Sequence, residues 1–268
     1  MNKFLVLICA ACLLIGGCGS DNVQRIGMIE YENVTEEVFN KQRKKIAEEQ
    51  HESLDCEYVF FDNMVSMLSA LKSGQIDYMS TYEAVAKYFV KNHSDFEYEP
   101  LSPELTDVFC CAMREEDIAL KKEFDGAILK MTRDGTLIKL VRKYIAEFYF
   151  DQTPEIIEMP KFYNDTIVKI GVTGDLPMLD YIRPDGVPAG FNTAVLAEIS
   201  RLIGRNFVIV QIDSGARAAA LASGKVDVVF WAVVPQTEEI LPLNIDKPDG
   251  VILTEPYFSD KNVHVKLR

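Results

Sequence analysis

Two side chains capable of ligand chemistry stand out because each follows an apolar run typical of a β-strand. Arg217 comes after residues 207–212, near the start of an expected helix, where its guanidinium could bind an anionic group. Trp231, the only tryptophan, ends residues 226–231, and its ring could stack on a ligand or a cation. The alternatives are an exposed helix arginine and an ordinary core aromatic. Both residues are candidates for a binding site.

The histidines give little support for catalysis. His51, His93 and His264 each lack a nucleophile and an orienting acid nearby in the sequence. The sequence also contains no glycine-rich phosphate loop and no cluster of metal ligands. We therefore expect a binding protein rather than an enzyme, with no metal and no cofactor.

Composition limits the partners. The chain has 268 residues, is 48% hydrophobic and carries a formal net charge of −13, so it can bury one large core or two modest ones. The negative charge argues against nonspecific binding to nucleic acid or anionic lipid. Beyond residue 18, Cys56, Cys110 and Cys111 match neither a disulfide framework nor a zinc site, although one disulfide to Cys56 stays open.

The first residues are similar to a bacterial export signal. Lys3 precedes an apolar stretch, residues 4–15, that is too short to span a membrane as a stable helix. Gly16 and Gly17 then lead to Cys18, and this order resembles the lipobox of lipoproteins, in which the cysteine carries lipid. We expect residues 1–17 to be a signal peptide and Cys18 to anchor the chain at the periplasm or cell surface. An ordinary secretory signal is the alternative.

An internal repeat divides the rest of the chain. Residues 71–77, LKSGQID, recur as residues 221–227, LASGKVD. In both halves the glycine and the aspartate suit a turn from a helix into a strand, so Asp77 and Asp227 are expected to be structural. The repeat predicts two similar modules.

Each module follows the same order of elements. Strands are expected at residues 26–29, 58–61 and 76–80, and again at 168–172, 207–212 and 226–231. Helices are expected between them, with Asn33 capping residues 33–50 and Asn192 capping residues 192–203. Strand-helix-strand-helix-strand predicts an α/β fold in which each lobe is a mainly parallel sheet flanked by helices.

Ligands of parallel sheets bind beyond the carboxyl ends of the strands, so two facing lobes predict a cleft between them. Tyr31 and Thr35 lie where a helix N-terminus could donate backbone N–H groups to an anion, or where Thr35 is a plain cap. The cleft loops are acidic, which indicates a solute with a cationic group. The acidic residues are Glu30, Glu32, Asp62, Glu83, Asp175 and Asp180.

The second module resembles the first lobe of the family 3 extracellular solute-binding proteins, which have the two-lobed type II periplasmic binding fold. The resemblance implies that the chain captures a small polar solute, an amino acid or a related compound, for an ABC importer. The matching marks, in order, are Asp175 and Pro177, Asp185-Gly186, Gly190-Phe191, Gly224 with Asp227, and residues 256–259, PYFS.

Residues 25–145 resemble the family's second lobe and its closing helices, so the lobes run in reversed order. We interpret this as a circular permutation in which residues 146–166 join the old ends and the new ends lie at a crossover between lobes. A piece of a tandem array and a swapped dimer are the alternatives to a permuted monomer.

The resemblance implies these domain boundaries. Residues 24–105, with about 262–268, form the family's second lobe, and residues 166–261 form its first lobe. Residues 106–150 supply a hinge strand and closing helices that pack on residues 166–261, and residues 151–165 are a linker. The hinge is expected to pair residues 108–114 with residues 262–267.

The family's ligand clamp is half missing. Its members usually place a carboxylate-binding arginine where this chain has residues 233–239, VVPQTEE. An acid that holds the ligand's ammonium has a displaced counterpart in Glu83, beside Tyr82, while Asp180 and Tyr181 occupy positions that often face the ligand. The expected ligand-binding residues are Trp231, Arg217, Asp180, Tyr181, Glu83, Tyr82, Tyr31 and Thr35. A ligand-sensing or partner-binding lipoprotein and a dehydratase-type enzyme are the alternative functions.

Overall fold

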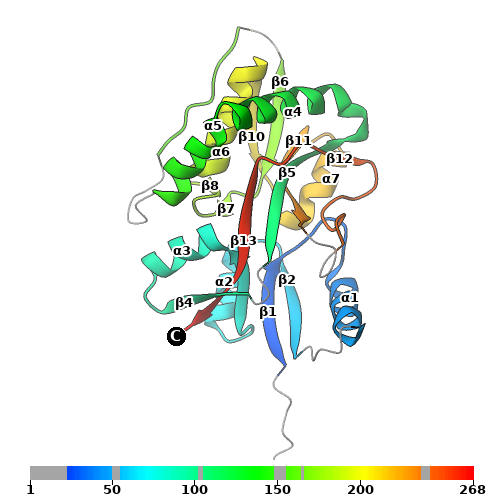
Figure 1. Cartoon of the computed structure of the whole chain (residues 1–268), viewed down its shortest axis with the longest axis vertical. Coiled ribbons are helices and arrows are strands. Elements are labelled where there is room, and N and C mark those ends of the chain that lie inside the picture. Colours follow the sequence, from blue (N-terminus) through cyan, green and yellow to red (C-terminus); the bar gives the residue numbers. More distant parts are fainter. Residues whose placement is uncertain (1–22, 50–54, 102–104, 148–154, 164–165, 237–241) are drawn as a thin grey trace, which may run out of the picture.

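The computed structural model describes residues 23–49, 55–101, 105–147, 155–163, 166–236 and 242–268. They form two α/β lobes, one above the other, joined by long strands (Figure 1). The expected two-lobed α/β architecture is thereby confirmed. The signal peptide, Cys18 and much of the expected linker lie outside the described residues. No helix in the described ranges is long and apolar enough to cross a membrane.

The N-terminal lobe of this chain, from here on the first lobe, is an open sheet with helices on both faces. Its strands run in the order β2-β1-β3-β13-β4, and β1 is parallel to both β2 and β3. Side chains alternate along β1, so Met28 packs with Phe39 of α1 while Gly27 faces Met67 of α2. The elements are β1 (Gln24–Ile29), α1 (Glu36–Glu49), β2 (Cys56–Phe61), α2 (Met64–Lys72), β3 (Tyr78–Tyr82), α3 (Glu83–Asn92) and β4 (Phe96–Pro100).

The second lobe repeats this plan in the order β10-β6-β11-β5, with β10 and β11 both parallel to β6. Its elements before the repeat are β5 (Thr106–Arg114), η1 (Glu115–Asp117), α4 (Ile118–Arg133), α5 (Thr136–Val141) and η2 (Arg142–Ala146). The repeat then brings β6 (Ile167–Val172), β7 (Asp175–Leu176), β8 (Asp180–Ile182), β9 (Pro188–Ala189), α6 (Gly190–Ile203), β10 (Asn206–Gln211), η3 (Ser214–Ala216), α7 (Arg217–Ala222), β11 (Val228–Pro235), β12 (Val251–Leu253) and β13 (Phe258–Leu267).

The repeated segments occupy equivalent places in the two sheets. Asp77 accepts a hydrogen bond from the backbone N–H of Arg25 at 2.8 Å, and Asp227 accepts one from Lys169 at 2.9 Å. Each aspartate therefore fastens the start of the third strand to the start of the first, at the end far from the other lobe. The preceding Gly74 and Gly224 have φ of 72° and 69°, a backbone conformation that glycine adopts without strain.

The lobes are connected through β13, which belongs to both sheets. Its residues 258–261 pair with residues 106–109 of β5, and residues 262–267 pair with β3 and β4. The expected hinge pairing of residues 262–267 with 108–114 was therefore wrong by about four positions of β13. The expectation that the chain ends near a crossover was also wrong, because Gln24 and Leu267 line one hollow at the outer end of the first lobe. Circular permutation itself stays a prediction.

Neither expected asparagine caps its helix. Asn33 donates its side-chain amide to the carbonyl of Asn244 at 2.9 Å, and the hydroxyl of Thr35 instead accepts from the N–H of Val38 at 3.4 Å. Asn192 lies inside α6, because the helix begins at Gly190 and its first N–H groups bind backbone carbonyls of Met178 and Leu179. Carbonyls from a neighbouring loop thus replace the side-chain cap.

Gly190 provides a test of this arrangement. Its φ is 85°, and a Cβ would lie 3.0 Å from the carbonyl oxygen of Met178. Gly190→Ala is expected to lower the free energy of unfolding by about 2–3 kcal/mol, from backbone strain and overpacking. Gly126→Ala is the control: Gly126 lies in α4 with open space around its Cβ position, and alanine should stabilise by about 0.5–1 kcal/mol. Equal urea midpoints for both variants would contradict this.

Candidate functional site

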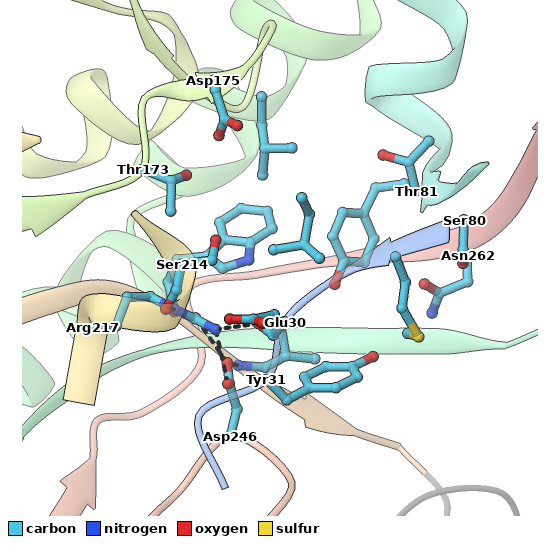
Figure 2. A pocket seen from close by; sticks show the side chains of 16 residues that line it. Glu30, Tyr31, Ser80, Thr81, Thr173, Asp175, Ser214, Arg217, Asp246 and Asn262 are labelled. Carbon is cyan, nitrogen blue, oxygen red and sulfur yellow. Dashed lines mark hydrogen bonds and ion pairs between the residues drawn. The ribbon is translucent and has the colours of Figure 1, made fainter. Parts of the chain in front are cut away.

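A small cavity lies where the strand ends of the two lobes face each other (Figure 2). The first lobe lines it with residues 28–31 and 80–82, and Asn262 of β13 completes that side. The second lobe contributes Thr173, Asp175, Leu176, Ser214, Arg217, Trp231, Val233 and Asp246. The cavity volume is about 40 Å³, which holds only a few water molecules. A solute of amino-acid size would need the lobes to move apart.

Arg217 is the centre of the contacts between the lobes. Its side chain is 2% exposed, and both terminal nitrogens bind the carboxylate of Asp246 at 3.0 Å. The guanidinium also donates to the backbone carbonyls of Trp231 at 2.7 Å, Ser214 at 3.1 Å and, across the cleft, Glu30 at 2.8 Å (Figure 2). The arginine is therefore engaged by the protein itself, and a ligand anion would have to displace these partners.

Asp246, which no sequence pattern marks, is the counter-ion of this arginine. It lies between β11 and β12, is fully buried, and accepts backbone hydrogen bonds from Glu32 at 2.7 Å and Val233 at 2.9 Å. Glu32 belongs to the first lobe and Val233 to the second. One carboxylate thus joins the arginine and the backbones of both lobes.

Glu32 brings a second carboxylate to the same arginine. Its Oε1 lies 3.5 Å from Nε of Arg217, and its side chain is 1% exposed. In the described part of the chain neither of its carboxylate oxygens accepts a hydrogen bond. Burial raises its pKa to about 7, since the attraction of Arg217 only partly offsets the lost hydration. Glu32 is therefore only partly ionised near neutral pH.

The other carboxylates facing the cleft give it negative character. Asp175 of the second lobe accepts from the N–H of Met64, at the N-terminus of α2, at 2.5 Å. Glu30 shares a hydrogen bond with Asp62 on the first-lobe side, and burial together with this second carboxyl raises the pKa of Glu30. Burial likewise raises the pKa of Asp175. Since Arg217 is neutralised by Asp246, the charge left over in the cleft is negative.

Trp231 is aimed into the cleft by a β-bulge. The register of β11 against β5 shifts between Phe230 and Ala232, and Trp231 has φ of 149°. Its ring stacks on Phe109 with centroids 4.2 Å apart and meets Tyr82 edge-on at 5.4 Å. The residue is 4% exposed, so it packs in the core and walls the cavity at once.

The structure brings four of the eight expected ligand-binding residues to the cavity: Trp231, Arg217, Tyr82 and Tyr31. The other four line other parts of the fold. Asp180 is buried and accepts hydrogen bonds from the N–H groups of Thr173 and Gly174, which shapes the cavity rim from behind. Tyr181 pairs with Asp175 in the small sheet, Glu83 forms an ion pair with Lys87 at 3.0 Å, and Thr35 caps α1.

In the described ranges, no group of three or more His, Cys, Asp or Glu side chains is arranged to hold a metal ion. The cysteines that the structure describes, Cys56, Cys110 and Cys111, are all reduced, so the disulfide left open by the sequence does not form. The arrangement suits noncovalent binding by hydroxyls, carboxylates and aromatic rings.

Removal of Arg217 tests its structural role. Arg217→Met leaves Asp246 buried without a cation, and we expect the free energy of unfolding to fall by about 3–5 kcal/mol. In an Asp246→Asn background the same change should cost less, giving a coupling of about 1–3 kcal/mol in urea denaturation. Strictly additive effects would show that the two residues do not stabilise the fold together.

Glu32 makes stability depend on pH. Its folded-state pKa, about 7, lies above the usual value of 4.5, so the folded protein holds this proton more tightly and loses stability as pH rises from 4.5 to 7. Gln mimics the protonated acid. Glu32→Gln should therefore match the wild type near pH 4.5 and exceed its stability by about 1–3 kcal/mol at pH 8. Parallel curves of unfolding free energy against pH would contradict the assignment.

Two sequence comparisons find known proteins that are similar to this chain. Residues 168–265 match the family model described as bacterial extracellular solute-binding proteins, family 3. A relative, the probable histidine-binding protein of Campylobacter jejuni, is 27% identical over 106 residues, which is 39% of this chain. The aligned segment spans 38% of the length of that relative.

Solved structures also align with most of the chain. An ancestral arginine-binding protein is 14% identical with a TM-score of 0.39, over 92% of this chain and 84% of its own. The methionine-binding protein MetQ is 13% identical with a TM-score of 0.43, over 92% and 84%. A ligand-binding component of an ABC-type import system from Staphylococcus aureus is 14% identical with a TM-score of 0.43, over 90% and 65%.

The two-lobed architecture is established by the strand order of the chain itself. The match to the bacterial extracellular solute-binding proteins of family 3 covers residues 168–265, in the second lobe.

Proposed function

We propose that this chain is an extracytoplasmic solute-binding protein that captures a small polar solute with a cationic group between its lobes. The observation that carries the proposal is the charge of the cleft. Glu30 and Asp175 line it from opposite lobes, and its only lining cation among the described residues, Arg217, is neutralised by Asp246. A buried negative site attracts a positive ligand group.

The aromatic and hydroxyl side chains of the cleft support the same proposal. The rings of Trp231 and Tyr82 line the cavity, and aromatic rings can pack against a cation or an apolar segment of a solute. Ser214 is 2% exposed, lines the cavity, and its hydroxyl has no hydrogen-bond partner among the residues that the structure describes. A buried hydroxyl without a partner is costly, so a ligand or a water that binds it is favoured.

The match of residues 168–265 to the family 3 solute-binding proteins supports transport as the purpose of this binding. The proposed partners are the permease of an ABC importer and, through lipid on Cys18, the membrane. We propose in addition that the chain is a circularly permuted monomer whose solute is an amino acid or a related compound. Because the carboxylate-binding arginine of the family is not found at its usual place, the cationic group is the better defined part of the solute.

A ligand-sensing role without transport is a second candidate, and the bonds between the lobes favour it. Besides Arg217, the N–H of Asn33 binds the carbonyl of Ile245 at 3.0 Å and the N–H of Ser214 binds that of Asp62 at 3.1 Å. A solute must break such bonds to enter, and an equilibrium between two lobe arrangements is what a sensor reports.

A ligand screen tests the binding proposal. L-lysine and 1,4-diaminobutane should raise the melting temperature, since a ligand at a hundred times its dissociation constant adds about 2.7 kcal/mol. Glutarate should not. Glu30→Gln and Asp175→Asn should each weaken cation binding about tenfold in calorimetric titration, because each removes a charge-assisted contact. Binding of the anion alone would overturn the proposal.

Asp134→Asn is the matched control for charge. Asp134 lies at the turn between α4 and α5 and contacts Thr136. The substitution therefore removes one negative charge far from the cleft. Its variant should keep the affinity of the wild type. A loss as large as that of Glu30→Gln would mean that overall charge, rather than the cleft, attracts the solute.

A further inference from the structure

A second cavity lies beside the cleft, between α1 and the strands that connect the lobes. Its volume is about 120 Å³, and we call it the hinge cavity. It is defined by Tyr31, Phe39, Tyr58, Asp107, Asn262 and His264. A cavity of about 150 Å³ holds benzene in another protein, so this one has room for roughly four or five non-hydrogen atoms.

Asp107, at the start of β5, puts a buried carboxylate into the hinge cavity. It is 3% exposed and accepts hydrogen bonds from the side-chain amide of Asn262 at 2.8 Å and from the hydroxyl of Tyr82. Within the described ranges no Lys, Arg or His forms an ion pair with it. Burial raises its pKa to about 6, so most of it is ionised at pH 7. A buried carboxylate without a counter-ion favours a cation from outside.

Aromatic rings form the wall on the side of α1. Phe39 lies at the centre of this group, stacked with Tyr31 at 6.0 Å between centroids and edge-on to Tyr58 at 5.0 Å. Ring faces carry partial negative charge and attract ammonium groups. The cavity therefore brings aromatic rings together with the carboxylate of Asp107.

The remaining charged groups limit the ligand to a single positive charge. Arg43 of α1 lines the hinge cavity, hydrogen-bonded to the hydroxyl of Tyr58. His264 is half-buried, and the loss of hydration lowers its pKa to about 4, so it is neutral at pH 7. A second ammonium group near Arg43 would be repelled.

We propose that the hinge cavity is a binding site for a small organic monoammonium ion, whose cationic group contacts Asp107 and the Tyr31, Phe39 and Tyr58 rings. This site lies outside the cleft, and the proposal does not depend on what the cleft binds. Its ligand would touch residues of both lobes, since Asp107 belongs to the second lobe and Phe39 to the first.

Three probes of similar size test the charge preference: n-propylammonium, 1-propanol and propionate, titrated calorimetrically into the full chain at pH 7. The ammonium ion should bind at least about tenfold more tightly than the alcohol, because a charge-assisted hydrogen bond is roughly twice as strong as a neutral one. Propionate should not bind. Equal affinity for ammonium and alcohol would overturn the proposal.

Asp107→Asn keeps the shape of the side chain and removes its charge, so the preference for n-propylammonium should disappear. Asp260→Asn is the matched control. Asp260 lies opposite Asp107 in the strand pairing, is half-buried, and accepts from the N–H groups of Ala84 and Lys261, but it does not line the cavity. The control should bind the probe as the wild type does, and an unchanged preference in Asp107→Asn would sink the proposal.

Two further variants cover the remaining outcomes. If Asp107→Asn does not fold, Phe39→Leu removes the central ring and should reduce the preference for the ammonium ion severalfold; an unchanged preference would contradict the site. Asp175→Asn, which alters only the cleft, should leave unchanged the n-propylammonium binding that Asp107→Asn removes, while any second equivalent bound in the cleft should bind more weakly. If it instead abolishes that binding, the probe occupies the cleft, which overturns the hinge site while leaving the proposed function intact.

Discussion

The relation between the two lobes depends on one buried arginine. Arg217 binds both oxygens of Asp246 and reaches the backbone of the opposite lobe at Glu30. A buried ion pair adds little net stability, because both charges lose their hydration, yet it is costly to break. Its effect here is geometric. The hydrogen bonds that cross the cleft, from Arg217 to Glu30 and from Glu32 to Asp246, fix the distance between the lobes. The network therefore specifies one arrangement of the lobes more than it strengthens the fold.

The same network changes what the cleft can bind. An arginine with unused hydrogen-bond donors would select an anion. An arginine whose donors are all bound by protein groups only lines the cavity. The charge that a solute meets then comes from Glu30, which is hydrogen-bonded to Asp62, and from Asp175. Burial raises the pKa values of Glu30 and Asp175. A cationic group on the solute would favour their ionised forms, so binding would lower those pKa values.

Much of the fold could be predicted because its signals are local. The turn of residues 71–77 and 221–227 needs only a glycine with positive φ and an aspartate that reaches the adjacent strand, and both lie within the repeat. The site could be predicted only in part. Arg217 follows a strand and Trp231 lies within an apolar one, so the sequence could single out both. Asp246, in contrast, pairs with an arginine 29 positions away and reaches a backbone N–H 214 positions away. No periodicity marks such a residue.

The misplaced predictions share a physical cause. Asn33 and Asn192 have the side chains of helix caps, but groups distant in sequence satisfy the same backbone positions first. Asp180 and Glu83 have the charge of ligand contacts, but nearby donors bind them: two backbone N–H groups and Lys87. In each case the residue type suggests one partner, whereas the structure shows another arrangement. Which donor meets which acceptor is decided by tertiary geometry, and this also limits what a sequence says about a ligand.

The shared walls of the two cavities connect their occupancy. Tyr31 and Asn262 line both the cleft and the hinge cavity. Asn262 donates to Asp107 on one side, and Tyr31 packs on Phe39 on the other. A solute that parts the lobes must shift Tyr31 relative to Asp107, because these two residues come from different lobes. A ligand in the hinge cavity that prefers the arrangement seen here would therefore oppose entry of solute into the cleft.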